Sequence, residues 1–190
     1  LENDANLMAY AEWRLVYPEV NDLLLIKHGT GVGSGLILNG NLFTGADGAA
    51  GDIGHIQLDE LGGIDCLCGK ENCVEAASGG GALVSKLKSL GYKVKNTQDL
   101  ADLARAGDRE VIKLIAEAAS YLGKAIADAI NLFNPRKIII EGRVVESTDL
   151  YLSTLKEVIY KRAAALATKD LEIVQSKLGT DRALLGAAQL

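Results

Sequence analysis

An α/β layer fold is the class that the sequence predicts, because buried strands alternate with amphipathic helices along the chain. Residues 22–28 (DLLLIKH) and 137–140 are apolar runs bounded by turn residues, a pattern typical of buried strands. Between these runs, apolar residues from Val111 to Phe133 recur every three or four positions, which predicts a long amphipathic helix. Glycines at 29–35 mark a turn directly after the first strand.

The chain opens with a further predicted helix. Apolar residues at helical spacing run from Met8 to Leu15, and Pro18 ends the pattern. Asn3 or Asp4 is suited to cap this helix, since short polar side chains accept hydrogen bonds from the first free backbone N–H groups.

A predicted hairpin follows the first strand. The glycine loop 29–35 leads into a strand at 36–38, and Asn39-Gly40 is suited to a type I′ turn before a return strand at 42–43. Small residues then form a loop, and residues 54–58 are predicted to be another short strand.

The second half of the chain continues the alternation. Apolar spacing predicts a helix over 152–166, a strand over 170–175 and a last helix over 182–190. Residues 1–190 are therefore interpreted as one domain. Its abrupt start, without an initiator Met, leads us to expect that it is part of a larger protein.

Composition excludes several classes of protein. With 20 Lys and Arg against 25 Asp and Glu, the formal net charge of −5 argues against binding nucleic acid through bulk charge. No apolar run approaches the roughly 20 residues that a membrane helix needs, and no secretory signal opens the chain. We therefore expect a cytoplasmic protein without a membrane partner.

The most specific motif is a metal-binding pattern in the loop 55–75. All three cysteines of the chain, Cys66, Cys68 and Cys73, lie within eight positions, eleven residues after His55. Three thiolates and one imidazole complete the tetrahedral shell of a structural Zn²⁺. An odd number of clustered cysteines is a poor disulfide framework and is better suited to hold a metal in a reducing compartment. The alternative is three unrelated buried thiols.

The glycine turn is the second motif. Glycines let the backbone approach a ligand, and consecutive N–H groups can bind an anion. The turn has neither the Lys of a Walker A loop nor the following helix of a dinucleotide fingerprint. The alternative is a tight hairpin that binds nothing. The candidate phosphate-contacting residues are Gly29, Thr30, Gly31, Gly33 and Gly35.

Polar residues outside the turn form the third signal. Asp4 is either a helix cap or a carboxylate that accepts a proton from a substrate hydroxyl. Asp52 and Glu75 flank the metal loop together with His55. Such carboxylates could accept hydrogen bonds from sugar hydroxyls or could be solvated surface groups.

Taken together, these strings closely resemble the ROK family of bacterial sugar kinases and sugar-responsive transcription regulators. The resemblance rests on ENDAN, GTGVGSG, GAAGDIGHIQ and CLCGKENCVEAASG, which occur in this order. It implies the actin-like, ribonuclease-H-like ATPase fold, in which two α/β lobes flank a cleft. The chain then corresponds to the second lobe with a zinc loop, and the first lobe is largely absent.

The resemblance also implies roles for individual residues. Asn3 and Asp4 match the family's sugar-binding pair, with Asp4 in the position of the kinase base. Asp52 and His55 match its Glu-x-Gly-His motif, in which the His both binds zinc and faces the sugar. Glu75 matches a sugar-contacting Glu. The glycine turn matches the loop that faces ATP, and its Mg²⁺, in the kinases.

Three departures favour the regulator branch of the family. Asp52 is one methylene shorter than the usual Glu, and Glu141-Gly142 replaces the usual Gly-Gly near the nucleotide. A carboxylate at that position would repel phosphates. The loop 59–65 is also slightly long.

The sequence therefore predicts the sugar-sensing effector domain of a ROK-type repressor, which binds a sugar or sugar phosphate. DNA would be bound only through an N-terminal helix-turn-helix domain absent from this chain, and a homodimer or larger oligomer is expected from the family. The first alternative is a ROK sugar kinase that transfers the γ-phosphate of ATP, with Asp4 as base. The second is a zinc-stapled oligomerisation fragment without a ligand.

Overall fold

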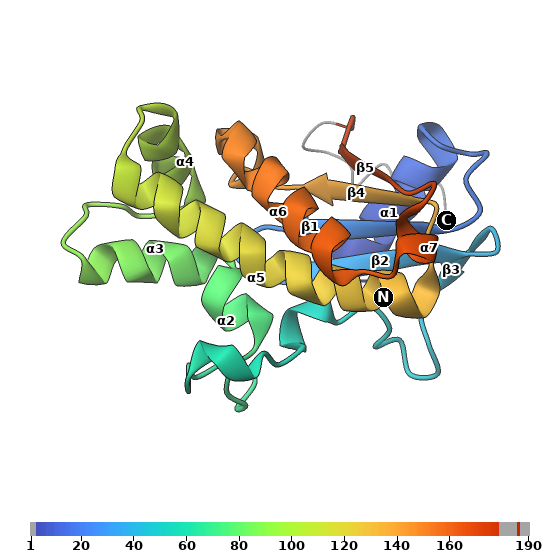
Figure 1. The fold of residues 1–190 in the computed structure, drawn as a ribbon, viewed down its shortest axis with the longest axis horizontal. Coiled ribbons are helices and arrows are strands. Elements are labelled where there is room, and N and C mark those ends of the chain that lie inside the picture. The colour runs from blue at the N-terminus through green and yellow to red at the C-terminus, as the bar shows by residue number, and fades with distance from the viewer. Residues whose placement is uncertain (1–2, 179–185, 187–190) are drawn as a thin grey trace.

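A five-stranded mixed sheet forms the centre of the protein in the computed structural model, which describes residues 3–178 and residue 186 (Figure 1). The strand order is β3-β2-β1-β4-β5, with β1 parallel to β4, β4 parallel to β5, and the β1–β2 and β2–β3 pairs antiparallel. The strands are β1 (Leu23–His28), β2 (Val32–Leu38), β3 (Asn41–Phe43), β4 (Lys137–Glu141) and β5 (Glu172–Gln175).

Helices cover both faces of this sheet, which confirms the predicted α/β fold (Figure 1). The helices are α1 (Asp4–Leu15), α2 (Val74–Ser78), α3 (Gly80–Ser89), α4 (Thr97–Arg105), α5 (Arg109–Phe133), α6 (Asp149–Arg162) and α7 (Ala165–Thr168). Three short 3₁₀ helices span Ile53–His55, Asp59–Leu61 and Val145–Ser147. None of the described helices is both long and apolar enough to cross a membrane.

The side chains of β1 alternate between two separate cores. Leu24 and Ile26 belong to the larger core, which α5 and α6 close, whereas Leu23 and Leu25 belong to the smaller core beneath α1. Because successive strand residues point to opposite faces, a strand covered on both sides is apolar throughout. This explains the run of four apolar residues that predicted the strand.

Polar caps define the ends of the two helices that matter most for the layers. The Asn3 side chain accepts a hydrogen bond from the Ala5 N–H at 2.8 Å, so Asn3 rather than Asp4 caps α1. Asp108 caps α5 through the Val111 N–H at 3.1 Å, and Asn134 ends that helix with a positive φ of 45°. Both helices therefore begin where their sequences allow the first N–H groups to be satisfied.

The parallel pairing brings three chain segments to one edge of the sheet. β1 and β4 both end there, and the antiparallel β2 begins there, so that Lys27 pairs with Gly33 on one side and with Glu141 on the other. We call the edge formed by the ends of β1 and β4 and the start of β2 the turn edge. The glycine turn lies on it, as ligand sites do at the carboxyl ends of parallel strands.

Several predicted boundaries are wrong. β2 begins at Val32, so only residues 29–31 form the glycine turn. Residues 54–58 form no strand; the chain makes a 3₁₀ helix and then a single bridge from Gln57 to Cys73. The helix predicted over 152–166 breaks after Arg162, where the Asn131 side chain accepts the Ala164 N–H and starts α7.

Two further sequence predictions in the same regions have clear outcomes. The type I′ turn is confirmed by positive φ angles of 50° at Asn39 and 69° at Gly40. The helix predicted over 182–190 falls outside the described residues apart from Gly186, which is helical and buried.

Candidate functional site

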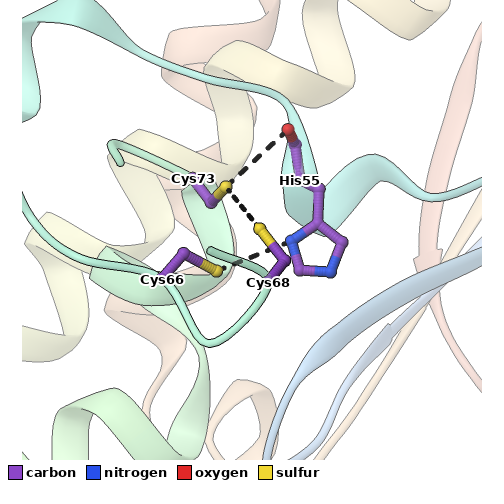
Figure 2. A group of neighbouring side chains, drawn as sticks. All are labelled: His55, Cys66, Cys68 and Cys73. Atoms are coloured by element: carbon purple, nitrogen blue, oxygen red, sulfur yellow. Dashed lines mark hydrogen bonds between the residues drawn. The ribbon is translucent and has the colours of Figure 1, made fainter. Parts of the chain in front are cut away.

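Four side chains converge at the tip of the loop that joins β3 to α2. One ligand atom from each of His55, Cys66, Cys68 and Cys73 lies within 4.8 Å of all the others. Figure 2 shows the three sulfur atoms gathered beside the imidazole, with Cys66 Sγ 3.6 Å from His55 Nδ1 and Cys68 Sγ 3.7 Å from Cys73 Sγ. This cluster could hold a metal ion, and three sulfurs with one ring nitrogen suit the tetrahedral preference of zinc.

The thiols of this cluster differ in their surroundings. Burial, followed by the neighbouring sulfurs, raises the pKa of the Cys73 thiol to about 12, whereas a backbone hydrogen bond at Lys70 lowers the pKa of Cys68. Ionising all three thiols would place like charges in contact. A bound divalent cation would offset the repulsion between the thiolates. Metal ligation therefore deprotonates thiols outright.

Backbone bonds hold the loop in a shape that brings its cysteines together. Asn72 has a positive φ of 62°, and its side-chain oxygen accepts the N–H groups of Gly63 and Ile64 at 2.8 and 3.1 Å. Single bridges join Gln57 to Cys73 and Asp65 to Glu71. Residues 62–72 thus gain order from local polar contacts, since none of them belongs to either core.

The metal cluster leads directly into α2, which carries Glu75. Cys73 is the residue before α2, and the Glu75 carboxylate Oε2 accepts a hydrogen bond from the Val32 N–H at 2.7 Å. A Cβ at Gly31 would lie only 2.3 Å from the same oxygen. Gly31 therefore leaves the space in which Glu75 reaches the start of β2.

The start of α3 fastens the glycine turn from the other side. The N–H groups of Gly80 and Gly81 donate to the carbonyl oxygens of Gly29 and Thr30 at 3.0 and 2.8 Å. A Cβ at Gly80 would lie 2.5 Å from the Gly29 oxygen, which explains the small residue there. These two N–H groups are consequently engaged within the protein.

The two glycines of β2 face helix α1. A Cβ at Gly35 would lie 2.5 Å from the Ala5 carbonyl oxygen and 2.7 Å from the Ala9 Cβ. At Gly33 the nearest atom, the Ala5 Cβ, would be 3.6 Å away, an ordinary contact. Gly35 therefore has a packing role, which is to let α1 lie directly on the sheet.

Asp4 lies in the first turn of α1 and forms an ion pair with Lys27 of β1. Both side chains are partly exposed, 56% for Asp4 and 32% for Lys27. Lys27 was not among the site residues predicted from the sequence. The feature of the sequence that could have identified it is a positive charge at the end of an otherwise apolar strand. A lysine at such a position is expected to pair with a group of opposite charge.

Asp52 lies close to the metal cluster on its imidazole side. Asp52 Oδ1 is 3.9 Å from His55 Nε2, the ring nitrogen that points away from the sulfurs. Asp52 also contributes to a cavity of about 170 Å³ whose lining includes Leu36, Ile56 and Phe133. His55 can thus offer Nδ1 to a metal and keep Nε2 for a polar partner.

The candidate polar residues therefore fall into two groups at the start of β2. Glu75 meets Val32, and Gly54, next to His55, packs so closely that a Cβ there would lie 2.3 Å from the Val32 carbonyl oxygen. Asp4 joins the same region through Lys27, which pairs with Gly33. Strand β2 is the element that connects the two groups.

His28 lies beneath the glycine turn and is fully buried. Its Nε2 is 2.6 Å from the Ser78 carbonyl oxygen, which requires a proton on Nε2, and its ring packs 5.3 Å from that of Tyr151. Burial lowers the pKa of His28 to about 4, so the ring is neutral at pH 7. The histidine thereby ties the end of β1 to the end of α2.

The chain is similar to proteins of a known family. The model of the ROK family matches residues 1–190. The chain is 33% identical to a glucokinase of Halalkalibacterium halodurans over its whole length, and 34% identical over 90% of its length to the DNA-binding transcriptional dual regulator NagC of Escherichia coli. It spans 62% of the first relative and 44% of the second, about half the length of such proteins.

Solved structures show the same family likeness. A ROK family transcriptional regulator described as a homologue of the Escherichia coli MLC protein matches 98% of the chain and 50% of its own, with 29% identity and a TM-score of 0.89. A ROK glucokinase from Streptomyces griseus, in complex with glucose and AMPPNP, matches 100% of the chain and 66% of its own, with 27% identity and a TM-score of 0.85. The chain has the actin-like fold of these proteins and belongs to the ROK family.

Proposed function

We propose that this chain is the sugar-binding effector domain of a ROK-type transcription repressor. The proposed sugar site consists of Asn3, Asp4, Asp52, His55 and Glu75. Carboxylates accept hydrogen bonds from sugar hydroxyls, and the Nε2–H of an imidazole bound to metal through Nδ1 donates one; a site built on such bonds discriminates strongly between sugars. Sugar binding would favour one of two arrangements of the parent protein through its difference in affinity for them.

The observation that supports a regulator over a kinase is the carboxylate of Glu141 at the turn edge. Glu141 ends β4 opposite Lys27, and the next residue, Gly142, passes so close to β1 that a Cβ there would lie 2.0 Å from the His28 carbonyl oxygen. A negative charge so near the glycine turn opposes the phosphates of a nucleotide. Phosphoryl transfer depends mainly on positioning those phosphates and their metal.

The metal cluster is proposed to hold one structural Zn²⁺. Ligation through His55 Nδ1 would fix the imidazole and leave Nε2 directed at Asp52, whereas ligation of Cys73 would fix the start of α2 and so the position of Glu75. The ion supplies conformational order to the loop, and the surrounding side chains would contact the sugar.

The remaining features concern the parent protein. Its contact with DNA is assigned to a helix-turn-helix segment outside this chain, because the net charge of −5 gives these residues no attraction for phosphate backbone. We also propose that the parent protein is cytoplasmic and forms a homodimer or a larger oligomer.

The test is an ADP-release assay on the full-length protein with a panel of hexoses and N-acetylhexosamines, alongside calorimetric sugar binding. We expect binding of at least one sugar and turnover well below the usual kinase range of about 1–100 s⁻¹. Turnover within that range, abolished by Asp4→Asn, would assign the protein to the kinases.

A ROK sugar kinase is the second candidate function, and Asp4 is the observation that favours it. Its carboxylate is 56% exposed at the start of α1, where it could accept a proton from a sugar hydroxyl. In that case the glycine turn would face ATP and Mg²⁺. A positioned base contributes about 10²–10⁴-fold, which is a small part of kinase catalysis.

A further inference from the structure

Two cysteines of the metal cluster are in contact but differ in their access to solvent. Cys68 is exposed, within a stretch in which residues 67–71 are all exposed, whereas Cys73 is fully buried just before α2. Their sulfur atoms lie 3.7 Å apart (Figure 2). An oxidant in solution can therefore reach the sulfur of Cys68, and the sulfur of Cys73 is already beside it.

The third sulfur is less suited to join either of the other two. Cys66 Sγ lies 3.6 Å from His55 Nδ1, on the imidazole side of the cluster. A single residue separates Cys66 from Cys68, so a disulfide between them would close a small, strained ring. Four residues separate Cys68 from Cys73, and Gly69 among them adopts a positive φ of 85° in a tight turn. The chain thus favours Cys68 and Cys73 as the pair that oxidation would join.

We propose that Cys68 and Cys73 are an oxidation site for hydroperoxides, at which a disulfide forms and the zinc proposed for the cluster is expelled. The proposal rests on the proposed zinc site and is independent of sugar binding. Cysteines that sense oxidants are solvent-accessible and have a second cysteine nearby that completes the disulfide. In a reducing compartment such disulfides are transient.

The oxidation has two stages. The Cys68 sulfur attacks one oxygen of hydrogen peroxide, the O–O bond breaks, and the products are a sulfenic acid on Cys68 and one water. The Cys73 sulfur then attacks the Cys68 sulfur, so that an S–S bond forms, the S–O bond breaks and the oxygen leaves as a second water. Overall, the two sulfurs lose two electrons, and the peroxide takes these with two protons, from the thiols or from solvent. A dithiol reverses the reaction by thiol–disulfide exchange.

The disulfide would remove two of the four candidate ligands. His55 and Cys66 would remain, and two ligands do not complete the tetrahedral shell that holds a structural zinc. Cys73 immediately precedes α2, which carries Glu75, and the Glu75 carboxylate accepts the Val32 N–H at 2.7 Å. Loss of the ion would therefore release the imidazole and the start of α2 together.

The experiment treats the full-length protein, purified without chelator, with increasing hydrogen peroxide. A chromogenic zinc indicator measures the released ion, and mass spectrometry of non-reduced peptides maps the disulfide. Cys66→Ser keeps the pair, whereas Cys68→Ser and Cys73→Ser each break it. The three variants are matched, because each removes one candidate metal ligand. Mapping of the unsubstituted protein decides the pairing even where a variant does not fold.

We expect the zinc to be lost as one Cys68–Cys73 disulfide per chain forms, and a dithiol with added Zn²⁺ to restore the bound ion. Cys66→Ser should form the same disulfide. Cys73→Ser should instead accumulate a sulfenic acid on Cys68, which dimedone labels. A disulfide that contains Cys66 or joins two chains, or zinc that stays bound in excess peroxide, would overturn the proposal. Protein without zinc before treatment would overturn the zinc site, and the disulfide map would still decide the pairing.

Discussion

The carboxylate of Glu75 accepts a hydrogen bond from the backbone N–H of Val32 at 2.7 Å, across 43 positions of sequence. This bond joins the helix that follows the metal cluster to the strand that follows the glycine turn. One oxygen of a residue proposed to contact sugar therefore also fixes the turn edge. A ligand that draws on Glu75 would act on both segments at once.

Replacing Glu75 should loosen this junction. Glu75→Ala leaves the Val32 N–H without its acceptor, and we expect a loss of about 1–3 kcal/mol in the free energy of unfolding. Urea unfolding measures it. Glu117→Ala, at an exposed position on α5, is the control and should change stability by less than about 0.5 kcal/mol. Equal effects of the two substitutions would contradict the role given to the bond.

Removing the metal should destabilise the protein through the loop. We expect about one equivalent of zinc per chain. Where free zinc had been held near a thousand times its Kd, chelation should lower the free energy of unfolding by about 4 kcal/mol. Metal analysis and thermal unfolding before and after chelation measure both. Added Zn²⁺ should restore stability and Mg²⁺ should not, because Mg²⁺ prefers oxygen ligands. Protein that contains no zinc when purified without chelator would rule out the site.

Gly35→Ala should separate α1 from the sheet. The new methyl group would lie 2.5 Å from a backbone oxygen of α1, which has no freedom to move away alone, so we expect a loss of about 1–3 kcal/mol. Gly33→Ala is the matched control two residues away, where the nearest contact is an ordinary 3.6 Å. It should be neutral or slightly stabilising, since alanine loses less entropy than glycine. A similar loss in both variants would refute the packing argument.

Stability should fall in mild acid because of His28. The pKa of its buried ring is lowered to about 4, whereas the unfolded chain binds the proton near 6.5. As the pH falls from 6.5 to 4, the unfolded state binds a proton that the folded state does not bind. The free energy of unfolding should therefore fall by about 3 kcal/mol in total.

His28→Gln isolates this contribution. Glutamine keeps an N–H donor for the Ser78 carbonyl oxygen but does not titrate, and His55 is unchanged in the variant. Unfolding measured in denaturant at pH 7 and pH 4.5 should therefore show a smaller acid-induced loss in His28→Gln. An identical loss in both proteins would show that another group causes it.

The alternation of elements and the metal-binding motif were both determined by the sequence itself. Strand β1 and helix α5 could be predicted because each buries a continuous pattern of apolar residues, and that pattern is local. The four candidate metal ligands could be predicted because they are close along the chain. The structure places them together, which is the geometry that their spacing suggested.

Only the tertiary structure decided which polar groups meet across the turn edge. Lys27 and Asp4 are 23 positions apart and Glu75 and Val32 are 43 apart, and both pairs form because strand pairing and helix packing bring distant segments together. The start of β2 at Val32 was equally beyond prediction. The segment 32–35 alternates Gly with Val and Ser and so has too few apolar side chains to mark a strand, and here the hydrogen bonds of β1 and the close approach of α1 determine its extended form.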